Sequence, residues 1–269
     1  MDIQIAGHAT YLYTGGKKLT PAEVPTKPVV VFIHGAQQDH SCWLLQSRWF
    51  AHHGYSVLAP DLPGHGRSAG QPLPSVEAMA DWIIALLDAL NVPQALLVGH
   101  SLGSLVALDA TARHPSRVRR TALIGTALPM PVSEALLAAT RDNEPKAIAL
   151  VNGWSYSATA QFGGSPAPGM WLLGVNKRLM ERQKTGVFFN DMNACNAYQR
   201  DPATLADITT PILLIAGSQD RMTSPKAAKA LQGLLPSSRL VTLAGSGHAL
   251  MAERPDGVLD ALREFAVGD

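Results

Sequence analysis

The chain has 269 residues, of which 46% are hydrophobic and 16% charged, and its formal net charge is +1 at pH 7. This length allows a single large domain, and the near-neutral charge argues against a surface that binds polyanions, so we expect no nucleic acid partner. The most apolar windows are much shorter than the roughly 20 residues that span a bilayer, and the N-terminus lacks the pattern of a secretory signal, so we expect neither feature.

The predicted elements begin with a hairpin at residues 3–13, where apolar residues alternate around a glycine. Short continuous apolar runs follow, as expected for strands buried on both faces of a parallel sheet; they lie at 28–33, 55–60, 94–99, 120–125, 211–217 and 239–245. Apolar residues three and four apart predict helices at 42–54, 75–91, 101–115, 224–236 and 253–267. The sequence therefore predicts an α/β fold with a mostly parallel sheet of about eight strands and helices on both faces.

The alternation of strand and helix stops between residues 129 and 200, where helical patterns follow one another without a strand. We therefore predict a core made of residues 1–128 and 201–269, with a helical insertion at 129–200. The two cysteines, Cys42 and Cys195, lie far apart and lack metal-ligand spacing, so we expect free thiols in a cytoplasmic protein. Length and composition are compatible with a monomer or a homodimer.

Residues 99–104, GHSLGS, contain a Gly-x-Ser-x-Gly motif that follows a predicted strand and opens a predicted helix. This is the context of a nucleophile elbow, in which Ser101 occupies a strained turn. Gly99 and Gly103 leave the strand and the helix room to approach closely.

A serine hydroxyl is a poor nucleophile at neutral pH, so it needs a base and a carboxylate that orients the base. Asp220 follows the predicted strand at 211–217, and His248 follows the strand at 239–245. Because active groups of parallel sheets collect at the carboxyl ends of the strands, both residues are candidates for these roles.

Five short motifs occur in the order and spacing of the α/β-hydrolase family, which the chain resembles over nearly its whole length: HG at 34–35, DLPGHGRS at 61–68, GHSLGS at 99–104, GSQD at 217–220 and GSGH at 245–248. The resemblance implies a catalytic triad of Ser101, Asp220 and His248, and places the family's helical cap, or lid, at the insertion. We expect neither a cofactor nor a metal.

The tetrahedral intermediate of acyl transfer needs two hydrogen-bond donors for its oxyanion. We expect these to be the backbone amides of Leu102, directly after the nucleophile at a helix N-terminus, and of Ala36, directly after HG. In the cap, Trp154, Met170 and Trp171 are our candidate substrate-binding residues. We expect the cap to select the substrate without contributing to the chemical step.

Other histidines and carboxylates occur in the same loops. We expect hydrogen-bonding or packing roles for His34, His65 and His100. Asp39 is placed to accept a hydrogen bond at a helix start, and Asp61 fits a turn.

Serine as the nucleophile decides the reaction class. Opening an epoxide or displacing a halide with serine would leave an ether that water cannot cleave through a carbonyl, whereas serine suits acyl transfer. We therefore predict an enzyme that hydrolyses a small to medium, largely apolar carboxylic ester or lactone through an acyl-enzyme. The alternatives are a carbon–carbon bond hydrolase, perhydrolase or acyltransferase with the same triad, or a receptor that binds a ligand on a hydrolase scaffold without turnover.

Overall fold

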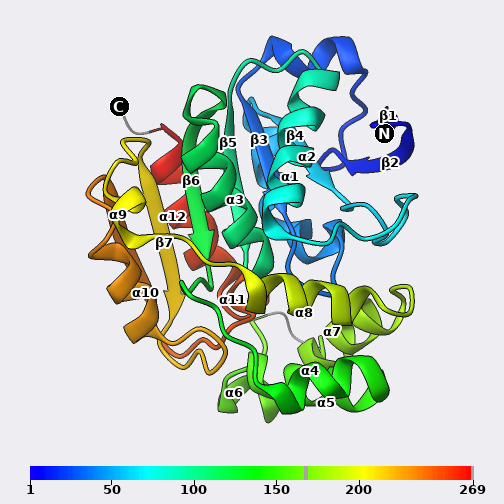
Figure 1. Cartoon of the computed structure of the whole chain (residues 1–269), viewed down its shortest axis with the longest axis vertical. Helices are drawn as coiled ribbons and strands as arrows, with labels where there is room; N and C mark the ends of the chain where they lie inside the picture. The colour runs from blue at the N-terminus through cyan, green and yellow to red at the C-terminus, as the bar shows by residue number, and fades with distance from the viewer. Residues whose placement is uncertain (167–168, 268–269) are drawn as a thin grey trace.

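The computed structural model describes residues 1–166 and 169–267, and an eight-stranded sheet lies at its centre with the order β1-β2-β4-β3-β5-β6-β7-β8 (Figure 1). The strands are β1 (Asp2–Ile5), β2 (His8–Tyr13), β3 (Val29–Ile33), β4 (Ser56–Pro60), β5 (Ala95–His100), β6 (Val118–Ile124), β7 (Ile212–Gly217) and β8 (Ser238–Leu243). β1 and β2 form the predicted hairpin, β2 is antiparallel to β4, and all other neighbours are parallel. The predicted α/β class and the mostly parallel sheet are therefore confirmed.

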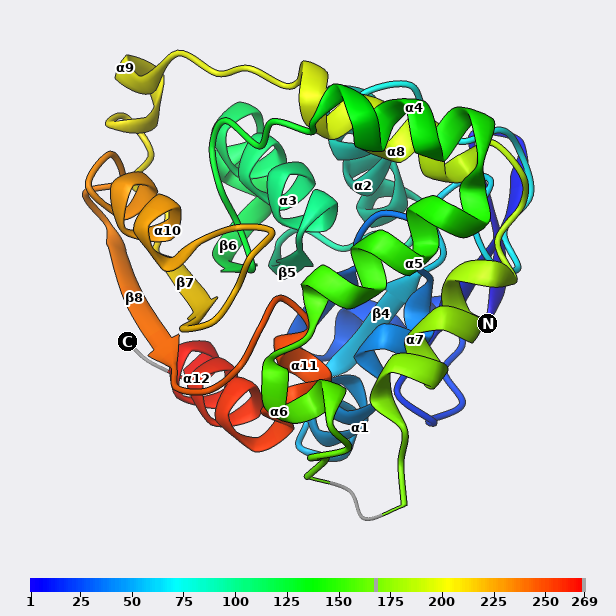
Figure 2. The ribbon, with the colours of Figure 1, turned by 90° about the horizontal axis from the view of Figure 1, so that it is seen from below.

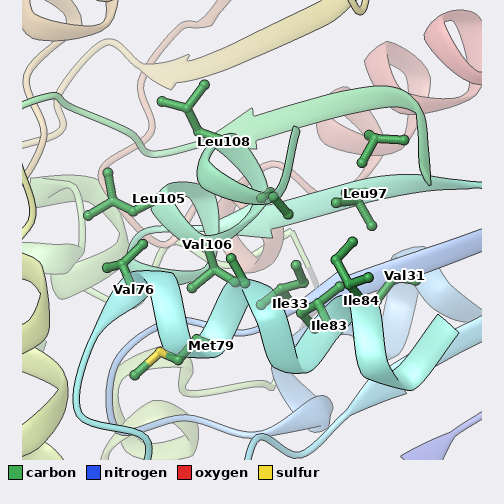
Figure 3. Packing of buried hydrophobic residues seen from close by; sticks show 14 of the residues in the cluster. Val31, Ile33, Val76, Met79, Ile83, Ile84, Leu97, Leu105, Val106 and Leu108 are labelled. Atoms are coloured by element: carbon green, nitrogen blue, oxygen red, sulfur yellow. The ribbon is translucent and has the colours of Figure 1, made fainter. Parts of the chain in front are cut away.

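Helices cover both faces of the sheet (Figure 2). One face carries α2 (Val76–Ala89), α3 (Leu102–Arg113) and α10 (Pro225–Gln232), and the other carries α1 (Leu44–His52) and α12 (Pro255–Val267). Successive side chains of a strand point to opposite faces of the sheet. In β3, Val31 and Ile33 therefore pack on the first side, which carries α2, α3 and α10, and Val30 and Phe32 pack on the second side, which carries α1 and α12. Figure 3 shows the first side, where Ile83 of α2, Val106 of α3 and Ile33 of β3 belong to one apolar cluster.

The edge of the sheet departs from the sequence prediction. We expected the run at 239–245 to be buried on both faces, but every residue of β8 is at least partly exposed. The reason is its position, because β8 has a neighbour on one side only.

A run of helices separates β6 from β7 in the chain, and we call it the inserted segment: α4 (Glu134–Asp142), α5 (Glu144–Ser155), α6 (Ala158–Gln161), α7 (Leu172–Glu181) and α8 (Val187–Ala197). It lies beyond the carboxyl ends of the central strands (Figure 1). Its helices share a small apolar core that includes Leu136, Ile148 and Phe188. The boundaries at 129 and 200 stay a prediction, but the segment is positioned to cover whatever lies at the strand ends.

The remaining helices are short: η1 (Pro21–Thr26), η2 (His40–Trp43), η3 (Pro115–Arg117), α9 (Pro202–Leu205) and α11 (Leu250–Glu253). Within residues 1–166 and 169–267, no helix combines the length and the apolar character that crossing a bilayer requires.

Candidate active site

Ser101 sits in a strained turn between β5 and α3. Its backbone angles are φ 53° and ψ −120°, a conformation that residues other than glycine rarely adopt. The turn is held by the Ser101 amide, which donates to the Ile124 carbonyl at 3.0 Å, and by the Ser104 amide, which donates to the Ser101 carbonyl at 2.8 Å. A Cβ atom on Gly99 would collide with the Gly103 carbonyl, so the close approach that the motif predicts is present.

His248 and Asp220 form a buried pair beside this turn. His248 Nδ1 lies 2.8 Å from Asp220 Oδ2, and the two residues are 4% and 5% exposed. An ionised carboxylate only accepts hydrogen bonds, so Nδ1 carries the proton and Nε2 is the nitrogen left to act as a base.

Three further hydrogen bonds hold the Asp220 carboxylate. The Met222 and Thr223 amides donate to Oδ1 at 2.8 Å each, and the Thr223 hydroxyl donates to Oδ2 at 2.8 Å. Burial by itself would raise the pKa of Asp220, but His248 and these donors hold it below its ordinary value. The carboxylate therefore stays ionised, which keeps the His248 ring in one orientation.

His100 supports the backbone of His248. Its Nε2 lies 2.9 Å from the His248 carbonyl, and because a carbonyl only accepts, Nε2 carries the proton. Burial and the neighbouring His248 ring lower the pKa of His100 to about 3, so the ring is neutral. Its Nδ1 has no hydrogen-bond partner among the described residues.

The amides of Ala36 and Leu102 are unengaged among the described residues, since neither donates a hydrogen bond within them. Leu102 is the first residue of α3, whose N-terminal amides have no intrahelical partner. The peptide before Ala36 is oriented by His34, whose Nδ1 donates to the Gly35 carbonyl at 2.9 Å. In a planar trans peptide the carbonyl and the amide point in opposite directions, so the Ala36 amide points away from His34.

The other loop residues have the structural roles that the sequence predicts. His34 Nε2 accepts from the Leu62 amide at 3.1 Å, and burial lowers the pKa of His34 to about 4. Asp39 caps η2 by accepting from the Ser41 amide at 2.9 Å. Asp61 accepts from the His40 and Arg67 amides of the turns around it.

A cavity that opens to solvent lies over Ser101. The core contributes Gly35, Ala36, Gln38, His100, Ser101, Met222, His248 and Ala249, and the inserted segment contributes Val151, Ser155, Asn176, Met180 and Met192. None of these described lining residues is Asp, Glu, Lys or Arg. Ser101 and His248 therefore open onto one largely apolar space, closed from above by α5, α7 and α8.

The three aromatic and Met residues that we expected to bind substrate do not line this cavity. Trp154 is half-buried and packs on the core of the inserted segment, while Met170 and Trp171 are 46% and 67% exposed. Val151 and Ser155 of α5 reach the cavity, whereas Trp154 of the same helix packs against the core of the inserted segment, and Met170 and Trp171 lie before the first residue of α7.

The structure also adds residues that sequence analysis missed. Thr223 holds the acid, and Gly125 at the end of β6 makes room for the base, since a Cβ there would lie 3.0 Å from His248 Nδ1. Gln38 and Asn176 bring amide groups to the cavity and bond to each other at 3.1 Å. Gly125 carries a sequence signal, a glycine directly after a predicted strand. Thr223 lies three residues after Asp220 and contacts it locally, whereas Gln38 and Asn176 join distant parts of the chain.

Comparison with known proteins bears on the family and the fold of the chain. A model of the alpha/beta hydrolase family matches residues 30–261. The chain is 31% identical to a pimeloyl-[acyl-carrier protein] methyl ester esterase of Aromatoleum aromaticum, over 86% of this chain and 94% of that protein. It is 30% identical to epoxide hydrolase A of Mycobacterium tuberculosis, over 95% and 96% of the two chains.

Among solved structures, Est816, described as an N-acyl homoserine lactone degrading enzyme, superposes with a TM-score of 0.83 at 25% identity. The superposition covers 98% of this chain and 100% of that one. With a family model that matches most of the sequence and a shared fold over the full length, this chain belongs to the α/β-hydrolase family.

Proposed function

We propose that the chain is a serine hydrolase that cleaves a small to medium, largely apolar carboxylic ester or lactone through an acyl-enzyme. The observation that carries the proposal is one arrangement: Ser101 in a strained elbow and His248, paired with Asp220 at 2.8 Å, open onto the same cavity. In this proposal Ser101 is the nucleophile, His248 the general base and Asp220 the residue that orients the base.

The reaction would proceed in two halves. His248 Nε2 takes the proton of Ser101 Oγ as the oxygen attacks the substrate carbonyl, and the resulting oxyanion is bound by the amides of Ala36 and Leu102. The intermediate collapses, the alcohol leaves with the proton from His248, and Ser101 stays acylated. Water then attacks the acyl-enzyme with His248 again as base, which releases the acid and restores the serine.

The lining of the cavity supports an uncharged substrate. The side chains of Val151, Met180, Met192 and Met222 provide apolar contact, and Gln38 and Asn176 provide the polar groups. With no charged side chain among the described lining residues, an anionic or cationic group would lose its hydration without gaining a partner. The inserted segment would act as the cap that supplies much of this lining.

The names of the similar proteins favour esters and lactones over epoxides for this chain. Two of the three act on a methyl ester or a lactone, as named, and one is an epoxide hydrolase. Epoxide opening by Ser101 would end in an ether without a carbonyl for water to attack, so the chemistry of serine decides against it. The proposed enzyme is cytoplasmic and uses no cofactor or metal.

The test is a panel of nitrophenyl esters of graded acyl length together with a serine-reactive phosphonate probe. We expect turnover of short to medium esters, stoichiometric labelling of Ser101, and a loss in kcat of about 10⁴-fold in Ser101→Ala with folding intact. A Ser101→Ala variant that keeps a tenth of wild-type turnover would show that Ser101 is not the nucleophile. Binding of ester-like ligands without turnover or labelling would support the receptor alternative instead.

A further inference from the structure

The residue after Ala36 is held almost entirely by the inserted segment. Gln37 is fully buried and has a φ of 56°, which is unusual for a residue with a side chain. Its amide donates to Asp191 Oδ2 of α8 at 2.8 Å, and its Nε2 donates to the Met180 carbonyl of α7 at 3.2 Å and to Glu144 Oε1 of α5 at 3.3 Å. The loop that carries Ala36 thus depends on contacts made more than a hundred residues later in the chain.

Asp191 belongs to a buried pair that the proposed reaction does not use. His65 and Asp191 are both 0% exposed, and His65 Nε2 lies 2.9 Å from Asp191 Oδ2. The other ring nitrogen, Nδ1, lies 3.0 Å from the Pro63 carbonyl. Both partners are acceptors, so both ring nitrogens carry protons and the ring is an imidazolium.

The charge state follows from this geometry. Burial by itself lowers the pKa of His65, but the Asp191 carboxylate more than offsets it and the pKa is raised above its ordinary value. One oxygen of Asp191 therefore accepts from both the imidazolium of His65 and the amide of Gln37. Hydrogen bonds to an ionised acceptor are about twice as strong as those between neutral groups.

The Gln37 amide matters because of the peptide planes around Ala36. The plane before Ala36 is fixed by the His34 hydrogen bond to the Gly35 carbonyl. The plane after Ala36 ends in the Gln37 amide, which Asp191 holds. The two planes meet at the Cα of Ala36, so the orientation of Ala36 depends on both. A left-handed backbone such as that of Gln37 is strained for a residue with a side chain, so without Asp191 the plane after Ala36 would turn toward a relaxed conformation and only the His34 hydrogen bond would still orient the Ala36 amide.

We propose that Asp191 is a positioning residue for catalysis, and that its carboxylate holds the Ala36–Gln37 peptide so that the Ala36 amide faces the oxyanion of the reaction. This inference rests on the proposed function, because it presupposes an oxyanion at Ala36. It also gives the inserted segment a part in the chemical step, which we did not expect from the sequence. Since the Ala36 amide acts on charge that develops in the transition state, Asp191 affects kcat and leaves KM nearly unchanged.

The experiment compares Asp191→Leu with a matched control on the same helix. Asn190 also ties α8 to the core, because its Nδ2 donates to the Leu73 carbonyl at 2.8 Å, but among the described residues it makes no hydrogen bond to the loop of Ala36. We expect Asp191→Leu to lower kcat by about 10- to 100-fold with KM within about twofold, less than removal of a whole oxyanion donor costs. Asn190→Ala should keep both constants within about twofold.

A conservative variant and a transition-state probe separate positioning from a general loss of structure. Asp191→Asn keeps an oxygen for the Gln37 amide, so it should recover kcat to within about fivefold of wild type. A trifluoromethyl ketone, which forms an oxyanion on Ser101, should bind Asp191→Leu more weakly by the same factor as the loss in kcat, while binding of the uncharged alcohol product, which places no oxyanion at Ala36, stays constant. Should Asp191→Leu fail to fold, Asp191→Ser takes its place, because its hydroxyl is too short to replace the carboxylate.

An Asp191→Leu variant that folds and keeps kcat within twofold of Asn190→Ala would overturn the inference, as would a change confined to KM. These outcomes are distinct from a failure of the proposed function. That failure would appear in the wild-type protein, as an absence of ketone binding and of phosphonate labelling at Ser101.

Discussion

The buried neutral ring of His100 makes the folded state sensitive to acid. Burial and the neighbouring His248 lower the pKa of this ring from 6.5 to about 3. Between these two values the unfolded chain binds a proton at His100 that the folded chain does not bind, so the free energy of unfolding falls as the pH falls. At about pH 4.5, two units below the unfolded value and still above the folded one, this contribution reaches about 2.7 kcal/mol, at about 1.36 kcal/mol per unit.

The assay measures the free energy of unfolding in urea at about pH 7.5 and about pH 4.5 for the wild type, His100→Gln and His8→Gln. Glutamine does not titrate, so the decrease between the two pH values should be smaller by about 2.7 kcal/mol in His100→Gln. His8 is exposed on β2, and its replacement should leave the decrease unchanged. Because the free energy of unfolding of each variant at one pH is compared with its own value at the other pH, the cost of repacking around residue 100 cancels. The same decrease in His100→Gln as in the wild type would refute the reasoning.

Three further predictions follow from the site. Asp220→Asn should lower kcat by about 10³- to 10⁴-fold with the fold retained, because the amide favours the wrong tautomer of His248; steady-state kinetics showing near-normal turnover would place the acid elsewhere. Gly99→Ala should destabilise the protein by about 1–3 kcal/mol, because its Cβ would meet the Gly103 carbonyl; an unchanged urea midpoint would show that the elbow has more room than described. Met192 lines the cavity, so Met192→Ala should change the preference for acyl length by roughly 1–3 kcal/mol in kcat/KM, whereas Trp171→Ala, at an exposed residue, should not. The opposite result would show that the substrate binds at the exposed face of the inserted segment.

The features that the sequence predicts well are local or follow from chain order. Both faces of β3 are covered, and the run Val29–Ile33 is accordingly apolar without alternation. A continuous apolar run of this kind predicts a strand that is buried on both faces. The sequence also predicts the nucleophile elbow, because the strand, the two glycines, the serine and the helix that form it are neighbours in the chain. Asp220 and His248 are predictable because each follows a strand end, and parallel strands bring these ends to one edge.

The features that the sequence does not predict depend on long-range contacts and on where single residues lie in the fold. Aromatic content pointed to Trp171 as a substrate contact, but this residue lies just before α7 in extended backbone and is largely exposed, a placement that composition does not encode. The link between Asp191 and Gln37 spans distant segments and involves a backbone amide, so no residue pattern reports it. The same holds for β8, whose apolar residues look like those of a central strand although it is an edge.

The most direct test of the central claim is to identify the covalent intermediate. A nitrophenyl ester that the enzyme turns over would be mixed with the wild-type protein, quenched with acid within the first turnovers, digested and analysed by mass spectrometry. We predict that the acyl group appears on the peptide that contains Ser101, at the rate of the first turnover, and disappears as the substrate is consumed. Sustained turnover with no acyl group on Ser101 at any time point would contradict the account.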